Sequence, residues 1–442
     1  MRLKSTRKWL VVVVLLLCLP AGALEWRTAW SASAQNPYPV GYPTGQPDLS
    51  FAFPDPAKGA NDQSFRMVMA PTIWGEKVRI RFTNAFGVKP VTIDGAYIGL
   101  HRGSAAVVEG TNQPIRFGSS AKLTLQPGET AWSDAVDLPF VRRLSSDFLF
   151  GRKLAVSFHI AGESGLMTWH ALGQNTSYIS KPKAGVTGDD DGELSFPFGS
   201  YSWYFVDAVD MLAPSDTQVI ACFGDSITDG EYSTLNGDDR WPDILARIAN
   251  ARFGNKVAVI NAAISGNEVV GPVEHSAAKP YNGGPSAIDR IDRDLLSLSG
   301  VNAIIWLEGI NDLRTGGKTA GQVEAGMRQV VDHVRRTRPG IRIFAATLVS
   351  SLDSTIEGYG TRELDAQRRI LNDFIRTTDI FDGVIDFDSA TFDPNTGKIK
   401  PEYGPDSAIG RAPDWLHPNR AGYLRMAEAV NLDQVLGLSA AK

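Results

Sequence analysis

The sequence predicts two regions of different fold class: an antiparallel β-sandwich over residues 24–213, and an α/β domain with a three-layer, parallel-sheet architecture over residues 214–442. The first observation is length, because a chain of 442 residues exceeds the roughly 250–300 residues at which a single hydrophobic core stops growing. The second is a change of pattern near residue 218. Before it, apolar and polar residues alternate, whereas after it short apolar runs are separated by amphipathic stretches.

The first region has the period-two pattern of half-buried strands, in which successive side chains point to opposite faces of a sheet. Gly and Pro turn signals separate these stretches, and we find no internal repeat. Many short strands joined by such turns are typical of an antiparallel sandwich. The alternating stretches are 64–69, 77–82, 153–160 and 203–206, with turns at 84–87 and 126–128 and a proline-rich, irregular segment at 37–56.

The second region alternates between strands and helices. Its apolar runs suit strands that are buried on both faces of a parallel sheet, and the stretches between them have helical spacing. The predicted strands are 219–223, 257–260, 303–307 and 341–345, and the predicted helices are 285–298, 323–334, 363–375 and one beginning near Arg420. This alternation predicts a three-layer α/β architecture.

The first 23 residues have the features of a secretory signal peptide. Basic residues precede a short apolar core at 9–19, and Ala21-Gly22-Ala23 is a plausible cleavage site. The apolar core is shorter than the ~20 residues of a membrane-spanning helix. We therefore expect a secreted or periplasmic protein without a stable membrane span after cleavage, with a retained anchor as the alternative. Cys18 lacks the small residues before it that lipidation would need.

Composition excludes several other classes of protein. The net charge of −5 argues against nucleic-acid binding. Cys222 is the only cysteine after residue 23, so the mature chain forms no internal disulfide, and its apolar surroundings predict an inert core thiol. The sequence has neither a cysteine cluster nor an HExxH motif, so we expect no metal site and no cofactor. The acidic stretch 188–193 lacks the spacing of a calcium loop and is predicted to be a solvated hairpin tip.

Four short segments together indicate the function. Three of them follow predicted strands, and the fourth precedes the last predicted helix. The first is 223–230 (FGDSITDG), in which Ser226 stands just past a strand end. The others are 261–267 (NAAISGN), 308–312 (EGIND) and 414–419 (DWLHPN). Because ligands bind beyond the carboxyl ends of parallel strands, the first three segments are expected to meet at one edge of the sheet.

These segments resemble the blocks of the SGNH hydrolases, also called GDSL esterases/lipases, which are named for a serine, a glycine, an asparagine and a histidine. The matching residues are Ser226, Gly266, Asn311 and His417. The resemblance covers the chain from about residue 218 onward and implies an SGNH-type α/β hydrolase domain and a serine esterase. Two departures are the isoleucine at 227, in place of leucine, and Trp415, where a small residue is frequent.

The resemblance implies a role for each matching residue. Ser226 is the nucleophile, His417 the general base, and Asp414 the group that orients the histidine. The oxyanion of the tetrahedral intermediate is expected to meet the backbone N–H groups of Ser226 and Gly266 and the side-chain amide of Asn311. A nucleophile in a G-x-S-x-G turn, as in another large hydrolase fold, does not match residues 224–228.

Neighbouring residues leave alternatives open. Asp225 is expected to cap the turn, and Asp312 either orients Asn311 or has a structural role. His275 lies in the Gly- and Pro-rich loop that follows Gly266, and lining the substrate cleft is one of its two possible roles, beside having no part in the site. His333 is predicted at the surface, and the remaining histidines, His101, His159 and His170, are predicted to be structural.

The substrate is less well specified than the chemistry. The whole arrangement resembles secreted two-domain, xylan-associated esterases, which implies hydrolysis of short-chain (acetyl) esters on an acylated small molecule or polysaccharide. One alternative is a lipase or lysophospholipase acting on longer acyl chains, for which Val269, Val270 and Val273 offer some apolar surface. Others are an acyltransferase and a non-catalytic carbohydrate-binding protein that stacks sugars on Trp74, Trp132, Trp169 or Trp203.

Overall fold

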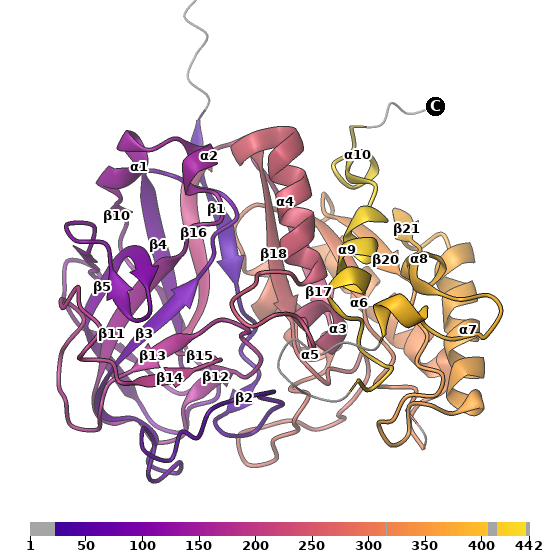
Figure 1. The fold of residues 1–442 in the computed structure, drawn as a ribbon, viewed down its shortest axis with the longest axis horizontal. Helices are drawn as coiled ribbons and strands as arrows, with labels where there is room; N and C mark the ends of the chain where they lie inside the picture. Colours follow the sequence, from indigo (N-terminus) through magenta and orange to yellow (C-terminus); the bar gives the residue numbers. More distant parts are fainter. Residues whose placement is uncertain (1–22, 315, 405–412, 439–442) are drawn as a thin grey trace, which may run out of the picture.

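The computed structural model describes residues 23–314, 316–404 and 413–438. An antiparallel β-rich region is followed by a region with a parallel sheet and helices (Figure 1). The predicted signal peptide falls almost entirely on residues 1–22, outside the described residues. None of the helices in the described ranges combines the length and the apolar character that crossing a membrane requires.

The β-rich region contains three antiparallel sheets, which follow the orders β1-β16-β4-β10, β14-β13-β3-β11-β5-β6 and β15-β12-β2. The predicted alternating stretches lie in β3, β4, β11 and β15–β16. The strands are β1 (Leu24–Ser31), β2 (Asn36–Pro37), β3 (Asn61–Met69), β4 (Lys77–Thr83), β5 (Val91–Gly103), β6 (Ala106–Val107), β7 (Gln113–Pro114), β8 (Leu123–Leu125), β9 (Thr130–Trp132), β10 (Val136–Asp137), β11 (Leu154–Glu163), β12 (Thr168–His170), β13 (Ser177–Ile179), β14 (Phe198–Ser200), β15 (Trp203–Tyr204) and β16 (Val206–Pro214), with short helices α1 (Pro139–Arg143) and α2 (Ser146–Leu149).

Aromatic side chains join the two larger sheets. Phe158 of β11 stacks on Phe65 of β3 at 5.5 Å between ring centroids, and meets Phe82 of β4 edge-on at 5.4 Å. All three rings are fully buried, and burial of one such side chain stabilises the fold by about 1.5–3 kcal/mol. The predicted strand at 203–206 is divided in two, because Phe205 has a φ of +56°, outside the extended region.

The second region is built on a five-stranded parallel sheet with the order β18-β17-β19-β20-β21. Its strands are β17 (Gln218–Gly224), β18 (Val257–Ala263), β19 (Val301–Leu307), β20 (Arg342–Ala346) and β21 (Gly383–Ile385). The order reverses at β17, whose neighbours are the next two strands in sequence. In open parallel sheets the ligand site lies at such a reversal, beyond the carboxyl ends of the strands.

Helices cover this sheet, and each predicted helix is present. α6 begins at a capping box between Thr319 and Gln322 and ends before Pro339. α4 contacts α9, while α6 contacts both α5 and α7. The helical elements are α3 (Ser226–Asp229), α4 (Trp241–Phe253), η1 (Gly254–Lys256), α5 (Ala287–Ile291) with a π-helical turn η2 (Asp292–Leu296), α6 (Ala320–Thr337), α7 (Arg362–Thr377), α8 (Phe387–Thr391), η3 (Pro401–Tyr403), α9 (Arg420–Glu428) and α10 (Leu432–Val435).

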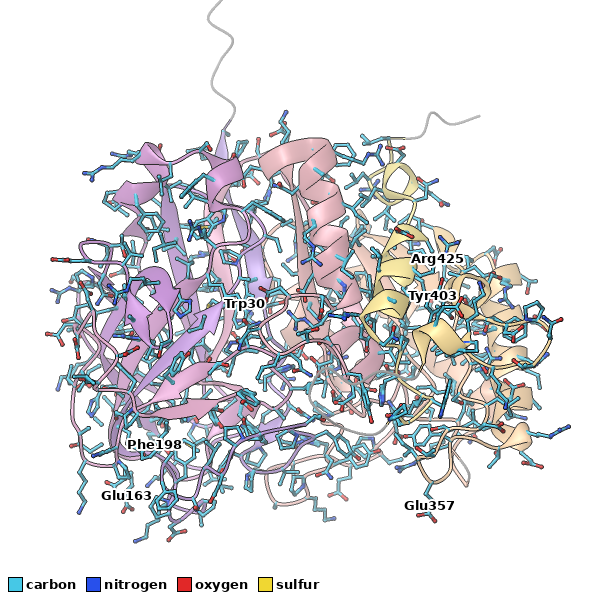
Figure 2. The ribbon with its side chains drawn as sticks, in the orientation of Figure 1. Trp30, Glu163, Phe198, Glu357, Tyr403 and Arg425 are labelled. Carbon is cyan, nitrogen blue, oxygen red and sulfur yellow. The ribbon has the colours of Figure 1, made fainter. Side chains whose placement is uncertain are left out.

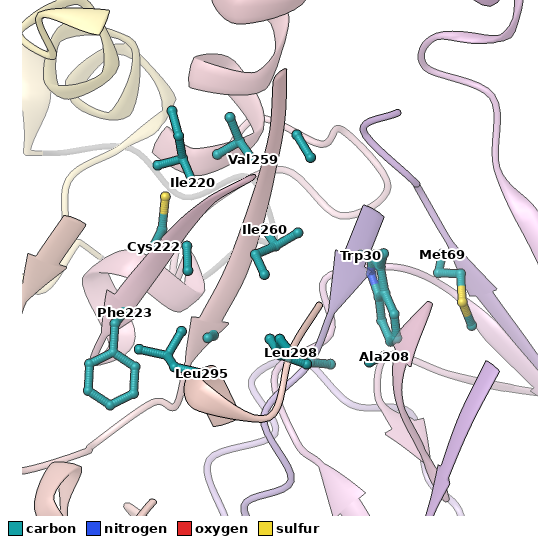
Figure 3. Packing of buried hydrophobic residues seen from close by; sticks show 14 of the residues in the cluster. Trp30, Met69, Ala208, Ile220, Cys222, Phe223, Val259, Ile260, Leu295 and Leu298 are labelled. Atoms are coloured by element: carbon teal, nitrogen blue, oxygen red, sulfur yellow. The ribbon is translucent and has the colours of Figure 1, made fainter. Parts of the chain in front are cut away.

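The two regions share one continuous hydrophobic core. β1 lies beside β18, and Figure 3 shows Leu298 between Trp30 of β1 and the side chains of β17 and β18. Trp30 is inside the molecule, whereas Glu163 extends from its edge (Figure 2). Polar contacts cross the same seam, since the Ser31 hydroxyl donates to the carbonyl of Asn261 at 2.8 Å. The regions are therefore packed as a single body along β1.

Cys222 provides a test of this core. Its side chain in β17 is fully buried, and burial raises the pKa of the thiol well above its ordinary value. We expect a maleimide reagent to leave Cys222 unmodified in the native protein and to label it after denaturation, as measured by mass spectrometry of the peptide that contains it. Stoichiometric labelling of the folded protein would contradict this packing.

Candidate active site

Ser226 stands at the turn between β17 and α3, at the carboxyl edge of the parallel sheet. Asp225 caps α3, as expected, because its Oδ1 accepts the N–H of Ile227 at 3.0 Å. The Ser226 side chain is largely buried, and its hydroxyl lies at the floor of a cavity. The tight strand–helix turn thus presents one hydroxyl group to that cavity.

His417 and Asp414 reach Ser226 from the loop before α9. The Oγ of Ser226 lies 2.7 Å from Nε2 of His417, and Nδ1 of His417 lies 2.6 Å from Oδ2 of Asp414. A carboxylate only accepts, so Nδ1 carries the proton and Nε2 is free to accept the hydrogen of the serine hydroxyl. The three residues form a continuous chain of hydrogen bonds.

The backbone holds Asp414 in place for this contact. Its Oδ1 accepts the N–H groups of Leu416 and His417 at 2.9 and 3.0 Å. Its carbonyl accepts the hydroxyl of Ser354, in the loop after β20, at 2.7 Å. Trp415, between the two, has a φ of +58° and packs on Gly404 instead of lining the cavity.

Burial and the contact between His417 and Asp414 act in opposite directions on the pKa of each group. Burial alone would lower the pKa of His417, but the adjacent Asp414 carboxylate outweighs it, and the net pKa is raised above its ordinary value. Burial alone would raise the pKa of Asp414, but the interaction with His417 lowers it. Asp414 therefore stays ionised, and the imidazolium that forms when His417 takes a proton is stabilised.

Three donors border the same cavity as Ser226. The backbone N–H groups of Ser226 and Gly266 have no acceptor among the residues that the structure describes. Asn311 donates one N–H of its amide to the carbonyl of Asn267 at 2.8 Å, which leaves its second N–H for the cavity. All three residues line this cavity, so they can donate to an oxyanion there.

Tyr359 and Asn267 orient the Asn311 amide. The Tyr359 hydroxyl donates to its Oδ1 at 2.8 Å, which fixes which end of the amide is the donor. Asp312 instead accepts the N–H groups of Val269 and Val270 at 2.8 and 3.0 Å. Of the two roles considered for Asp312, the contacts match the structural one.

The buried guanidinium of Arg290 underlies these loops. It donates to the side chain of Asn267 at 2.6 Å and to the carbonyls of Ala262 and Gly224 at 2.7 and 2.9 Å. It also lies over the ring of Phe223, 3.8 Å from the centroid. Arg290 therefore links the ends of β17 and β18 to the loop that carries Gly266.

The β-rich region supplies part of the cavity wall. The cavity has a volume of about 410 Å³, and Tyr42 and Thr44 of the irregular segment line it together with the residues above. Gly266 has a φ of +80°, and a Cβ there would approach the Tyr42 ring to 2.3 Å. The hydroxyl of Thr44 donates to the carboxylate of Glu231 at 2.7 Å. The cleft therefore lies between the two regions.

A second cavity of about 770 Å³ adjoins the first and shares Asn311, Arg314 and Glu357 with it. Figure 2 shows Glu357 pointing outward at this edge of the molecule. Val273 lines the second cavity. Val269 and Val270 line neither cavity and face Gly326 of α6 instead.

The other histidines lie away from the hydroxyl of Ser226. His275 bonds Asn36 at 2.8 Å, packs edge-on against Phe86 and does not line the catalytic cavity. His333 pairs with Asp292 at 2.7 Å on the surface. His170 is buried and contacts Asp229 at 3.1 Å. Within the described ranges, no group of three or more His, Cys, Asp or Glu side chains is arranged to hold a metal ion.

Sequence reasoning missed several residues of this site. Tyr42, Tyr281 and Tyr359 stand on irregular loops, where no periodicity distinguishes them from other aromatic residues. Glu231 directly follows the segment 223–230 that contains Ser226, and this position was the one sequence signal that it belongs to the site. Arg290 lies in a predicted helix, and only its complete burial distinguishes it from a surface arginine.

Comparison with known proteins places the second region in a family. Residues 222–425 match the family model of the GDSL-like lipase/acylhydrolase family, which confirms the resemblance and identifies this part of the chain as a carboxylic ester hydrolase domain. No curated protein matches the chain by sequence.

Solved structures give weaker similarity. A carbohydrate acetylesterase family member from Sinorhizobium meliloti is 18% identical, with 50% of this chain and 100% of that chain covered and a TM-score of 0.37. A family two carbohydrate esterase from Clostridium thermocellum, solved with cellohexaose, is 17% identical, with 90% and 99% covered and a TM-score of 0.34. A putative GDSL-like lipase from Parabacteroides merdae is 22% identical, with 51% and 97% covered and a TM-score of 0.35. Similarity at this level does not extend to substrate.

The raised pKa of His417 predicts where activity falls on the acid side of the pH profile. A general base must be unprotonated, so on the acid side kcat/KM for an ester should rise with pH through a pKa above the ordinary value of about 6.5. Asp414→Asn should move this limb to lower pH and reduce kcat by ~10⁴. Rates of p-nitrophenyl acetate hydrolysis across pH measure both effects. A limb that stays in place in Asp414→Asn would exclude this pairing.

The close approach at Gly266 predicts the effect of a single methyl group. Gly266→Ala should reduce kcat/KM by ~10², because its Cβ must displace either the Tyr42 ring or the turn that carries the backbone donor. The matched control is Gly321→Ala in α6, where an added Cβ meets nothing within 4 Å and stability should rise by about 0.5–1 kcal/mol. Wild-type kinetics in Gly266→Ala would contradict the expected crowding.

Proposed function

We propose that the protein is a secreted or periplasmic serine esterase that hydrolyses short-chain esters, chiefly acetyl esters, on carbohydrate by an acyl-enzyme mechanism. The observation that carries the proposal is the hydrogen-bond chain from Ser226 through His417 to Asp414, at 2.7 and 2.6 Å. In this proposal the catalytic residues are Ser226, His417 and Asp414, and the oxyanion hole is formed by Ser226, Gly266 and Asn311.

In the proposed mechanism, acylation is the first half of the reaction. Nε2 of His417 takes the hydroxyl proton as Oγ of Ser226 bonds to the ester carbonyl carbon, and the carbonyl oxygen becomes an oxyanion. The N–H groups of Ser226, Gly266 and Asn311 donate to that oxyanion. The intermediate collapses as the bond to the alcohol oxygen breaks, and His417 returns its proton to the departing alcohol.

Deacylation repeats these steps with water. His417 takes a proton from a water molecule, whose oxygen attacks the acyl carbon, and the bond to Oγ of Ser226 breaks as the proton returns to that oxygen. The products are the alcohol, the carboxylic acid and the free enzyme. An acceptor sugar in place of water would give acyl transfer, so product analysis belongs in the test below.

The lining of the cavity favours a polar alcohol and a small acyl group. Tyr42, Tyr281 and Tyr359 present rings with hydroxyl groups, and Glu231 and Arg314 add charge. Such aromatic and hydrogen-bonding surfaces suit a sugar ring. The apolar contribution of Ile356 and Leu416 is small for a long acyl chain, which argues against the lipase alternative.

The tryptophans of the β-rich region do not support a purely carbohydrate-binding role. Trp74, Trp169 and Trp203 are buried in the core. Trp132 is covered by the guanidinium of Arg79, 4.4 Å from the ring centroid. We propose instead that residues 24–213 form a β-sandwich domain that supplies one wall of the cleft, beside a three-layer hydrolase domain over 214–442.

Ester hydrolysis by wild type and Ser226→Ala tests the proposal. The substrates are p-nitrophenyl acetate, butyrate and dodecanoate, with acetylated xylan as the polymer and a free sugar as acyl acceptor. We expect kcat/KM to fall from acetate to dodecanoate and acetate to be released from xylan. Ser226→Ala should lower kcat by ~10⁴ or more without changing the unfolding temperature.

The control is Ser276→Ala, an exposed serine in the loop beyond Gly266, which should keep wild-type rates. A preference for dodecanoate would replace the proposal with a lipase. Turnover that survives in Ser226→Ala would exclude the acyl-enzyme mechanism.

A further inference from the structure

His170 of β12 meets only acceptors with its two ring nitrogens. Nδ1 lies 2.9 Å from the carbonyl oxygen of Ser33. Nε2 lies 3.1 Å from Oδ1 of Asp229 and 3.2 Å from the carbonyl oxygen of Leu172. A neutral imidazole carries one N–H group and one lone pair, so it would turn a lone pair toward an acceptor on one side. Only the imidazolium satisfies both sides.

Asp229 connects this histidine to the oxyanion donor. It lies in α3, one turn beyond Ser226, and its other oxygen, Oδ2, accepts both the backbone N–H and the hydroxyl of Ser265 at 2.9 and 3.0 Å. Ser265 immediately precedes Gly266. The carboxylate of Asp229 therefore bridges the β-rich region and the turn that carries the backbone N–H of Gly266.

The charges around this bridge match a protonated histidine. Asp229 and His170 are both buried, and Asp229 is the charged group that contacts the ring. The ring also meets two carbonyls, and its centroid lies 5.5 Å from that of the Trp203 indole. Arg240, whose charge also acts on Asp229, pairs with Asp243 at 2.6 Å. A neutral His170 would leave the buried Asp229 carboxylate poorly compensated.

We propose that His170 is a positioning residue of the esterase site: it is protonated in the folded protein at neutral pH, and its imidazolium holds Asp229 and so fixes the Ser265–Gly266 turn. The inference rests on the proposed function. It gives His170, a residue of the β-rich region, a part in catalysis that acts through Asp229 and Ser265.

The proposal has a pH dependence of definite sign. Burial lowers the pKa of His170, but Asp229 and the other acceptors outweigh this, and the pKa is raised. A raised pKa contributes stability that is complete below the unfolded value of about 6.5 and is lost as pH rises through the folded value. Activity should therefore fall on the alkaline side, opposite to the limb set by His417.

The experiment combines NMR with kinetics on the full-length protein. ¹⁵N shifts of the His170 ring, assigned by comparison with His170→Gln, should be those of an imidazolium at neutral pH. His170→Gln should lower kcat for p-nitrophenyl acetate by roughly 10- to 100-fold with little change in KM, since a displaced oxyanion donor acts on the transition state. In His170→Gln, the alkaline limb of the pH profile of activity should also be absent.

Two further variants complete the test. Adding Asp229→Asn to His170→Gln removes the uncompensated charge and should recover part of the unfolding temperature lost in the single variant. His101→Gln, at a histidine of β5 whose Nε2 bonds the carbonyl of Ser104 at 2.7 Å, is the matched control and should keep wild-type kcat.

The outcomes separate this inference from the proposed function. A neutral ring at neutral pH, or a lower unfolding temperature in His170→Gln with unchanged kcat beside an active wild type, would overturn the role of His170 alone. Failure of the wild type to hydrolyse any ester would overturn the function and, with it, the positioning role.

Discussion

The hydrogen bonds of the buried Arg290 guanidinium hold together the loops that form the site. A planar group with five N–H donors can satisfy several acceptors at once, and this one bonds the terminal carbonyls of two adjacent strands and the side chain of Asn267. Asp294 at 3.2 Å and the Phe223 ring surround it. Without Arg290, these buried acceptors would each lose a charged donor, and the loops that carry Ser226 and Gly266 would lose their common support.

Neighbouring residues also hold Asn311 and Asp414 in place beside the cavity. Tyr359 and Asn267 orient the Asn311 amide, and the backbone of the His417 loop holds Asp414. These contacts fix the donors before substrate binds, which is the condition under which electrostatic stabilisation of a transition state is effective. These partners come from three separate loops, which follow β18, follow β20 and precede α9, so the site depends on contacts between distant parts of the chain.

The sequence was sufficient for strands β17 to β20 and for helices α6, α7 and α9, although α4 was missed. It also singled out Ser226, Asp414 and His417, which the structure brings together, because each stands in a short block next to a strand end or a helix start. It was insufficient where contacts join segments far apart in the chain. Nothing near Tyr42 signals that its ring meets Gly266. β21 was missed because three residues carry no periodicity, and the break at Phe205 because its positive φ has no local sequence cause.

The part of the irregular segment around Tyr42 and Thr44 lies outside the hydrophobic core, and these two residues border the cavity beside Ser226. Tyr42 and Thr44 line the cavity from the β-rich region, while Ser226, Asp414 and His417 stand on the other region. Substitutions in this segment can therefore accumulate without disturbing the parallel sheet. Divergence among homologues with this architecture is expected to alter substrate preference through this segment, with the hydrolytic chemistry inherited unchanged.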